Sequence, residues 1–332
     1  MTSPHLVPVL ARRPRLLADI GGTNARFAWQ DGSGAPIGDV LSLPCADHAH
    51  LADAITAYLG LTGHAVPKDC AIAIANPVVR DEIQMTNHHW SFSIAALKAH
   101  FSFEQLRVLN DFTALALALP SLGANELRQV GGGAAVPGAP LALIGPGTGL
   151  GVSGLLPDGR GGWVPLQGEG GHATLAGCTP REHAVLAWIG AVHGHASAER
   201  AVSGQGLVDI HRALCALDAA TEPATGLDAA GITSAALEHG DARCLEAVNL
   251  MCAFLGTAAG NLALTLGARG GVYVGGGIVP RLGPAFALSP FRARFEVKGR
   301  FSAFLAPIPV FVIHAEQSPA LRGAASVLQT SA

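Results

Sequence analysis

The chain has 332 residues, of which 49% are hydrophobic and 14% are charged, and its formal net charge is −3. This hydrophobic content excludes a disordered chain, and the length corresponds to about two domains. Its lysines are limited to Lys68, Lys98 and Lys298, so the basic excess of nucleic-acid-binding proteins is missing and we expect no nucleic acid partner.

No segment is expected to span a membrane, because the longest uncharged stretch, residues 129–157, contains nine glycines and four prolines. The six cysteines form no C-x-x-C pair, which argues against a zinc site or a redox dithiol. A long chain with few cysteines is typical of the reducing cytoplasm. The low charged fraction favours a surface that a second subunit partly covers, so we expect a homo-oligomer.

After a loose arm at 1–13, the chain predicts a β-hairpin. Short apolar strands at 15–20 and 26–30 flank a glycine-rich turn at 21–24. Helices and strands then alternate. The predicted elements are a helix at 50–59, a strand at 70–75, a helix at 93–100 capped by Ser91 or Ser93, a strand at 106–109 and a helix at 113–119 that Pro120 ends.

Residues 121–140 are rich in Gly, Ala and Pro and form the first plausible domain boundary. A second hairpin follows, with strands at 141–144 and 152–155 on either side of a glycine turn at 145–151. The repetition of a glycine-turn hairpin predicts a duplicated structural unit. The later elements are helices at 181–192, 206–219, 233–238, 241–266 and 320–328 and strands at 271–274 and 310–313, an α/β pattern.

Three glycine turns each come directly after an apolar strand, the third at 275–277. Backbone N–H groups in such turns can converge on a phosphate, because no Cβ blocks its approach. A P-loop is excluded because no glycine loop continues into the Lys-Ser/Thr pair. Gly149, Gly151 and Gly154 match the dinucleotide pattern, but the seven glycines and two prolines of 154–171 argue against the helix that this pattern must open.

Asp19 precedes the first turn, and a carboxylate beside phosphate requires a cation between them because like charges repel. Mg²⁺ suits this position, since it prefers oxygen ligands and retains several waters. The alternative is that Asp19 caps the hairpin locally.

Further polar residues suggest a site for a ligand rich in hydroxyl groups. Asn110 and Asp111 follow a strand, where α/β proteins bind ligands, although Asp111 could instead cap the next helix. Glu169 and His172 lie in a glycine-rich loop, and Glu199 offers another carboxylate, or an exposed ion pair on a helix face. Carboxylates, an amide and an imidazole supply both acceptors and donors for hydroxyls. The pairs His88/His89 and His193/His195 lack metal-site spacing and are expected on the surface or in loops.

The order of these motifs resembles the proteobacterial glucokinases, a branch of the sugar kinase/actin/Hsp70 superfamily. The resemblance covers the chain from about residue 15 to its end. It is carried by the segments Asp19-Ile20-Gly21-Gly22-Thr23-Asn24-Ala25-Arg26, 85–90, Asn110-Asp111-Phe112-Thr113-Ala114, 145–151, Gly168-Glu169-Gly170-Gly171-His172, 197–200, 203–204, 260–264, 275–281 and 298–301.

The resemblance implies an ATP-dependent glucokinase that forms glucose 6-phosphate, the first step of glycolysis, in a cytoplasmic homodimer. It implies a two-lobed α/β, ribonuclease-H-like (actin-like ATPase) kinase fold with a central nucleotide and sugar cleft. The small lobe would comprise residues 1–121 plus 315–332, and the large lobe residues 122–314.

By matching position, the resemblance also implies the site residues. Glucose would be held by Asn110, Asp111, Glu169, His172 and Glu199, with Asp111 as the general base. ATP would be held by Ala18, Asp19, Ile20, Gly21, Gly22, Thr23, Gly147, Thr148, Gly149, Gly276 and Gly277, with Mg²⁺ bound near Asp19 through water.

The sequence departs from the family pattern at Ala18, where a glycine is common, and at Pro146, which stands in the second turn. Neither departure removes a catalytic group. The alternatives are a kinase of the same fold for another sugar, or a non-catalytic sensor or actin-like ATPase. The sugar kinase group that contains repressors fits less well, because only Cys178 follows His172 where that group has a cysteine-rich zinc motif.

Overall fold

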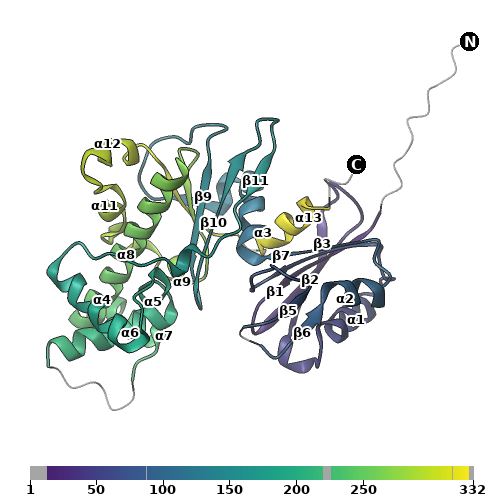
Figure 1. Ribbon diagram of the computed structural model, residues 1–332, viewed down its shortest axis with the longest axis horizontal. Helices are drawn as coiled ribbons and strands as arrows, with labels where there is room; N and C mark the ends of the chain where they lie inside the picture. Colours follow the sequence, from purple (N-terminus) through teal and green to yellow (C-terminus); the bar gives the residue numbers. More distant parts are fainter. Residues whose placement is uncertain (1–12, 87, 220–225, 316, 329–332) are drawn as a thin grey trace, which may run out of the picture. The chain divides into compact units, whose positions relative to one another are not determined.

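The structure is a computed structural model that describes residues 13–86, 88–219, 226–315 and 317–328 (Figure 1). The expected N-terminal arm, except Arg13, and Asn87 of the 85–90 motif lie outside these ranges. The chain divides into two compact units. Unit 1 is Met1–Ser121 with Gln317–Ala332, and unit 2 is Leu122–Glu316.

Unit 1 contains a five-stranded sheet in the order β3-β2-β1-β4-β7. The first three strands are antiparallel neighbours, and β4 and β7 continue the sheet parallel to β1. Every residue of β4 is buried, as expected for a parallel strand covered on both faces. The strands are β1 (Arg15–Ile20), β2 (Asn24–Gln30), β3 (Ile37–Pro44), β4 (Asp69–Ile74) and β7 (Gln105–Asn110), and a separate pair is β5 (Glu82–Gln84) and β6 (Ser91–Ser93).

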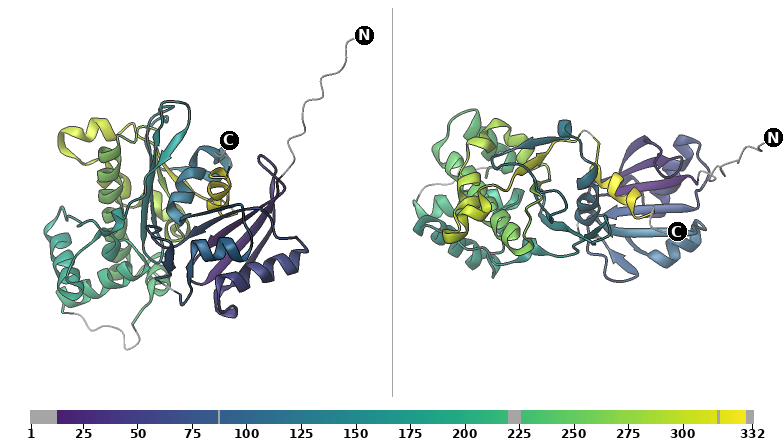
Figure 2. Two further views of the ribbon diagram at one scale, coloured as in Figure 1. Left: turned by 45° about the vertical axis from the view of Figure 1, so that its right-hand side comes forward. Right: turned by 90° about the horizontal axis from the view of Figure 1, so that it is seen from above.

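Helices cover both faces of this sheet, because the side chains of each strand alternate between them. Leu16 and Ile20 of β1 pack in one core with α1 (Leu51–Thr62) and α2 (Ile94–His100). Leu17 packs on the other face against α13 (Pro319–Ser326), which lies beside α3 (Asp111–Ala118) (Figures 1 and 2). Asp19 follows Leu17 by two residues and therefore emerges on this second face.

Unit 2 contains a six-stranded sheet in the order β11-β10-β9-β12-β13-β8. The strands β9, β10 and β11 are antiparallel neighbours, whereas β12 and β13 run parallel to β9. The bounds are β8 (Leu127–Gln129), β9 (Leu141–Pro146), β10 (Leu150–Pro157), β11 (Trp163–Pro165), β12 (Val272–Val274) and β13 (Val310–Ile313).

The central helix of unit 2 is α8 (Ala242–Leu266), which packs against α6, α7 and α11 (Figure 1). It is long and apolar enough to cross a membrane, but 67% of its most apolar window is buried inside the protein, so α8 is a core helix. The other helices are α4 (Pro180–His193), α5 (Ala198–Ala201), α6 (Gly204–Leu217), α7 (Ala229–Leu237), α9 (Ile278–Leu282), α10 (Pro284–Leu288), α11 (Phe291–Glu296) and α12 (Ser302–Leu305).

The two sheets share one topology. Each begins with three antiparallel strands whose first turn is rich in glycine, and two parallel strands follow beside the first: β3-β2-β1-β4-β7 and β11-β10-β9-β12-β13. The predicted duplication is therefore confirmed at the level of strand order.

Both predicted hairpins are confirmed, and several helix bounds are corrected. The predicted helix 233–238 begins at Ala229, because the Asp228 side chain accepts a hydrogen bond from the N–H of Gly231. The predicted helix 206–219 begins at Gly204, where Ser203 is the cap. The strands β3, β5, β6, β8 and β11 and the short helices α9 to α12 were not predicted. These helices are too brief to show a clear period.

Candidate active site

The junction of β7 and α3 places Asn110 and Asp111 at the carboxyl end of a parallel strand. Asn110 is the N-cap, and its Oδ1 accepts from the N–H groups of Phe112 at 2.9 Å and Thr113 at 3.1 Å. The helix therefore begins at Asp111, two residues before the predicted start. Asp111 does not cap α3 but lies in its first turn.

The carboxylate of Asp111 is held by two donors to Oδ1. Asn110 Nδ2 donates at 3.0 Å and the N–H of Phe112 at 2.8 Å. Burial, with a smaller contribution from the charge of Asp19, raises the pKa of Asp111 to about 6, against the lowering effect of the Phe112 N–H. Asp111 is thus a positioned carboxylate that is ionised at neutral pH and binds a proton more readily than an ordinary aspartate.

Asp19 lies near the end of β1, directly opposite Arg26 of β2 in the ladder. Its Oδ2 accepts from Arg26 Nη1 at 3.2 Å and from Ser318 Oγ at 2.6 Å. A cavity of about 270 Å³ is lined by Asp19, Gly21, Gly22, Thr23, Asn24 and Arg26. The first glycine turn therefore borders a cavity that is also lined by the carboxylate of Asp19 and the guanidinium of Arg26.

The backbone of this first turn is closed by its own hydrogen bonds. The N–H of Gly21 donates to the carbonyl of Asn24 at 3.0 Å, and the N–H of Cys45 donates to the carbonyl of Thr23 at 2.8 Å. Ala18 and Ile20 are fully buried in the sheet core. Their side chains therefore position the turn and do not face the cavity.

The second turn joins β9 to β10 and is tied to Glu199 of α5. Glu199 Oε2 accepts from the N–H of Leu150 at 2.9 Å. A Cβ on Gly149 would lie 2.4 Å from that oxygen, so a larger residue here would require the Glu199 carboxylate to shift. Pro146 ends β9, paired with Leu150, and so lies at the edge of the turn, not inside it as the sequence suggested.

The third turn lies against the second. Gly275 donates to the carbonyl of Ile144 at 2.9 Å, and Gly276 has a φ of +76°. A Cβ on Gly276 would lie 2.3 Å from the carbonyl oxygen of Pro146, so only glycine permits this approach. Gly277 then serves as the N-cap residue of α9.

The segment with Glu169 and His172 packs beneath the start of β10. Residues Gly170–His172 form a 3₁₀ turn with Glu169 at its N-cap, and a Cβ on Gly171 would lie 2.1 Å from the carbonyl oxygen of Leu150. His172 Nδ1 lies 4.0 Å from Glu199 Oε1. Glu169 and His172 are exposed. The imidazole of His172 and the residues Glu169 and Glu199 therefore lie near the start of β10 in unit 2.

The predicted residues thus form one cluster in each unit. Unit 1 brings together Asp19 with the first turn and, at another strand end, Asn110 and Asp111, while unit 2 brings together Glu199, Glu169 and His172 with the second and third turns. The sequence pattern predicted no role for Arg26 or for Ser318. The hairpin register could have revealed Arg26, whereas nothing in the sequence relates Ser318 to Asp19.

The histidines His193 and His195 each contact a polar side chain. His193 Nε2 is 2.8 Å from Oδ2 of the buried Asp209, and His195 Nε2 is 2.9 Å from Thr174 Oγ1. Within the ranges given above, no three His, Cys, Asp or Glu side chains are grouped to hold a metal ion, and all six cysteines are free thiols.

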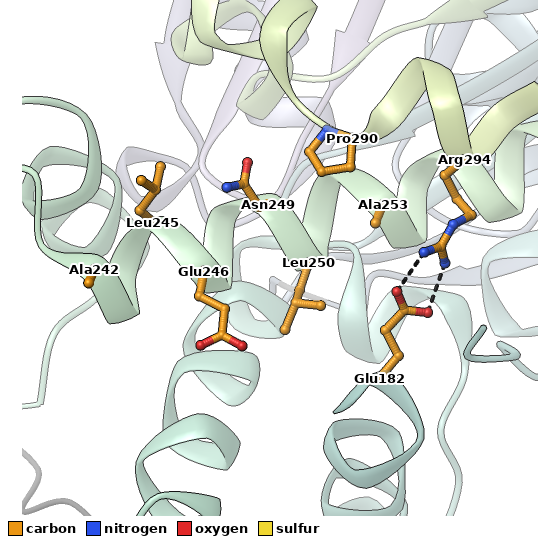
Figure 3. A pocket seen from close by; sticks show the side chains of 9 residues that line it. All are labelled: Glu182, Ala242, Leu245, Glu246, Asn249, Leu250, Ala253, Pro290 and Arg294. Atoms are coloured by element: carbon orange, nitrogen blue, oxygen red, sulfur yellow. Dashed lines mark hydrogen bonds and ion pairs between the residues drawn. The ribbon is translucent and has the colours of Figure 1, made fainter. Parts of the chain in front are cut away.

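A further cavity, of about 350 Å³, lies along α8 in unit 2 and contains none of the predicted site residues (Figure 3). Arg294 and Glu182 both line it and form a paired ion contact, at 2.7 and 2.8 Å. The neighbouring Glu246 and Asn249 come from α8. Because Glu182 is almost wholly buried, this ion pair serves to hold α4 to α11.

Comparison with known proteins gives the family of the chain. The glucokinase family model matches residues 16–331. The chain is 56% identical over 315 residues to the glucokinase of Chromobacterium violaceum, covering 95% of this chain and 89% of that protein. It is 54% identical over 319 residues to the glucokinase of Aromatoleum aromaticum, covering 96% and 95%.

Solved structures support the same assignment. A glucokinase from an Antarctic psychrotroph has a TM-score of 0.85 at 37% identity, covering 96% of this chain and 99% of that one. A ROK family glucokinase from Streptomyces griseus, solved with glucose and AMPPNP, shares the fold with a TM-score of 0.62 at 19% identity, covering 96% and 100%. The resemblance and the kinase fold predicted from the sequence are confirmed. The chain belongs to the glucokinase family, the hexose kinases that phosphorylate glucose with ATP.

Proposed function

We propose that Asp111 is the general base of this glucose phosphorylation. The observation that supports it is a carboxylate at the carboxyl end of β7 whose pKa burial raises to about 6. A general base works best when its pKa lies near the working pH. Asn110 and the N–H of Phe112 hold Oδ1, and we assign the proton transfer to Oδ2.

In the proposed reaction, the 6-hydroxyl oxygen of glucose forms a bond to the γ-phosphorus of ATP. The bond from that phosphorus to the β,γ-bridging oxygen breaks, ADP leaves, and the hydroxyl proton goes to Asp111. Phosphoryl transfer depends chiefly on alignment and charge neutralisation, so the task of the protein is to orient the hydroxyl and the phosphates.

We assign the sugar hydroxyls to Asn110, Glu169, His172 and Glu199. Glu169 and His172 present exposed polar groups, and Glu199 is fixed by its bond to the N–H of Leu150. Carboxylates accept from hydroxyls while the amide and imidazole can also donate, which matches a polyol.

We assign the phosphates of ATP to the first two turns and the nucleoside to the third. The cavity beside Gly21, Gly22 and Thr23 supports the first assignment. In the second turn the N–H of Gly147 donates to the carbonyl of Gly149, and the N–H of Leu150 donates to the carboxylate of Glu199. We therefore assign the N–H groups of Thr148 and Gly149 to phosphate. Gly276 and Gly277 are assigned to adenosine.

The donor set near Asp19 fits Mg²⁺ bound through water. The described residues offer no three-carboxylate cage, and Asp19 already shares Oδ2 with Arg26 and Ser318. Magnesium commonly uses one or two carboxylates, several waters and the substrate phosphates. When bound, the ion would neutralise charge that develops on the phosphates.

We further propose that the protein acts as a cytoplasmic homodimer. Leu288, Val297 and Phe301 of unit 2 are large apolar side chains that are 88%, 67% and 47% exposed, and a second copy that covered them would remove this apolar surface from water. Free thiols at all six cysteines suit a reducing compartment. Light scattering during size-exclusion chromatography gives the oligomeric state, and a monomer at micromolar concentration would refute the dimer.

The experiment that tests the substrate is a coupled assay of ADP release across glucose, mannose, glucosamine and fructose. We expect glucose to have the highest kcat/KM. A higher value for another hexose would favour a kinase of the same fold for that sugar. ATP consumption that does not depend on any sugar would contradict the assignment of the polyol site.

A further inference from the structure

The loop after β4 begins between the two strand ends that carry the assigned carboxylates. In the sheet, β4 pairs with β1 on one side and with β7 on the other, and all three strands are parallel. Asp19 stands near the end of β1, and Asp111 directly follows β7. The last residue of β4, Ile74, pairs with both Ile20 and Asn110. The residues that follow it therefore lie at the edge of the sheet where α/β proteins bind ligands.

Backbone hydrogen bonds fix the first two residues of this loop. The N–H of Ala75 donates to the carbonyl of Ile20 at 2.9 Å, and the N–H of Asn76 donates to the carbonyl of Ile74 at 2.7 Å. The next peptide group joins Asn76 to Pro77 and has no N–H, because the proline nitrogen carries no hydrogen. Its carbonyl, which belongs to Asn76, therefore depends on other contacts for its direction.

The half-buried side chain of Asn76 supplies those contacts. Its Oδ1 accepts from the N–H of Thr86 at 3.2 Å and from Thr86 Oγ1 at 2.9 Å. Its Nδ2 donates to the carbonyl of Pro77 at 3.2 Å. The side chain thus ties the loop after β4 to Thr86, two residues beyond the end of β5. These bonds hold the carbonyl of Asn76 in one direction.

The carbonyl of Asn76 faces the amide that we assign to the sugar. It accepts from Asn110 Nδ2 at 3.5 Å. The same nitrogen donates to Asp111 Oδ1 at 3.0 Å, and Asn110 Oδ1 accepts from Phe112 and Thr113 at 2.9 and 3.1 Å. The contact with Asn76 is the longest of the four. A hydroxyl can accept from Nδ2 and donate to the carbonyl, so it can enter this contact and leave both groups paired.

We propose that one sugar hydroxyl is shared between Asn110 Nδ2 and the carbonyl of Asn76, and that Thr86 is a positioning residue for that carbonyl. This inference deepens the proposed function and rests on the assignment of Asn110 to the sugar. An ether oxygen or a methylene group cannot both accept and donate, so the two groups select a hydroxyl. A ligand without this hydroxyl leaves a donor and an acceptor unpaired, which costs affinity.

The first test is steady-state kinetics of substitutions around this carbonyl. Asn76→Ala removes the bonds to Thr86 and should raise the KM for glucose about three- to tenfold, the range for a lost neutral hydrogen bond. The KM for ATP should stay within about twofold and kcat within about threefold, because the bonds that hold Asp111 remain. Equal rises in the KM for glucose and for ATP would contradict a role in sugar recognition.

Two substitutions of Thr86 isolate its hydroxyl. Thr86→Val loses the hydroxyl and keeps the N–H, so the KM for glucose should rise about two- to fivefold, and Thr86→Ser should restore it. The double variant Asn76→Ala/Thr86→Val should have the KM of Asn76→Ala, because Thr86 acts through Asn76. The matched control is Thr62→Val, which removes a hydroxyl bonded to the carbonyl of Tyr58 in α1 and should leave the KM unchanged.

Deoxy sugars test the shared hydroxyl itself. With one of 1-, 2-, 3- and 4-deoxyglucose, the ratio of kcat/KM between the wild type and Asn76→Ala should fall to about one, because that sugar lacks the shared hydroxyl. With the other three, the ratio should stay near its value for glucose. The same ratio with all four sugars would overturn the shared hydroxyl. A normal KM for glucose in folded Asn76→Ala, or effects of Asn76→Ala and Thr86→Val that multiply, would overturn the role of Thr86.

A further variant separates this inference from the proposed function. Asn110→Ser keeps an oxygen that can cap α3 but lacks the amide N–H groups. If this variant retained the wild-type KM for glucose, the assignment of Asn110 to the sugar would fail together with this inference. If Asn110→Ser raised that KM and Asn76→Ala did not, only this inference would fail.

Discussion

The glycine hairpins of the two units share a topology but have different residues in the strand pairs next to the turn. In each hairpin we compare the second residue pair of the strand ladder, counted from the turn. In β1 and β2 this pair is Asp19 and Arg26, whereas in β9 and β10 it is Gly145 and Gly151. Unit 1 therefore has two charges at this position, where unit 2 has two glycines. In unit 2, Glu199 of α5 accepts from the N–H of Leu150 next to the turn, and Gly276 of the third turn packs against Pro146.

This difference indicates that one strand order can support two tasks. In unit 1, ionisable groups stand at the ends of β1 and β7, and their mutual repulsion helps to raise the pKa of Asp111. In unit 2, β9 is buried along its whole length, and the carboxylates come from loops and a short helix around it. The duplicated frame supplies strand ends and tight turns, and the local sequence decides which of them carry charge.

The largest expected effect is that of removing the base from unit 1. Asp111→Asn should lower kcat about 10²- to 10⁴-fold, the usual contribution of general base catalysis, and leave glucose binding detectable by calorimetry.

The same substitution should affect stability. Because the pKa of Asp111 is raised in the folded state, its contribution to stability is lost as pH rises from about 4 to about 6. The asparagine variant should therefore unfold at a urea concentration equal to or above that of the wild type at pH 7.5. Full turnover in this variant would contradict the assignment.

A second prediction concerns the helix packing that positions this base. A Cβ on Gly323 of α13 would lie 1.7 Å from the carbonyl oxygen of Ala114 in α3. Gly323→Ala should separate the two helices and cost about 1–3 kcal/mol of unfolding free energy in urea titrations. The control is Gly60→Ala in the exposed part of α1, where a Cβ meets nothing within 4 Å and should stabilise by about 0.5–1 kcal/mol. Equal effects of the two substitutions would rule out this close approach.

The corresponding test in unit 2 is Gly171→Ala, whose Cβ would lie 2.1 Å from the carbonyl oxygen of Leu150. We expect the 3₁₀ turn to shift away from β10 and the KM for glucose to rise about tenfold, the loss of roughly one charged hydrogen bond. Gly168→Ala, where a Cβ meets nothing within 4 Å, should leave KM nearly unchanged. A rise in the KM for ATP alone would instead link this segment to the nucleotide.

The smallest expected effect is a shift of the pH profile. The logarithm of kcat/KM should fall with a slope of one below a pH of about 6, as Asp111 becomes protonated. Asp19→Asn removes a negative charge that raises this pKa, so the acid limb should move to lower pH by less than about one unit, whatever the residual rate. A shift to higher pH would mean that the two carboxylates do not repel one another.

Much of the fold was predictable because its signals are local. The alternating apolar strands, the two glycine hairpins and the long period of α8 appear in the sequence as the structure has them, within a few residues. The predicted bounds are wrong where side-chain capping or a short length determines where a helix begins. Asn110 moves the start of α3 to Asp111, and short helices such as α9 carry too few turns for a period.

The sequence by itself determined the family, the topology-bearing hairpins and the residue types near each strand end, because these depend on order along the chain. Only the tertiary structure decided that Ser318 supports Asp19 across 299 positions, that Glu199 reaches the N–H of Leu150, and that burial raises the pKa of Asp111. Such contacts arise when distant segments pack, and the free energy of a proton on Asp111 depends on surroundings that no local pattern encodes.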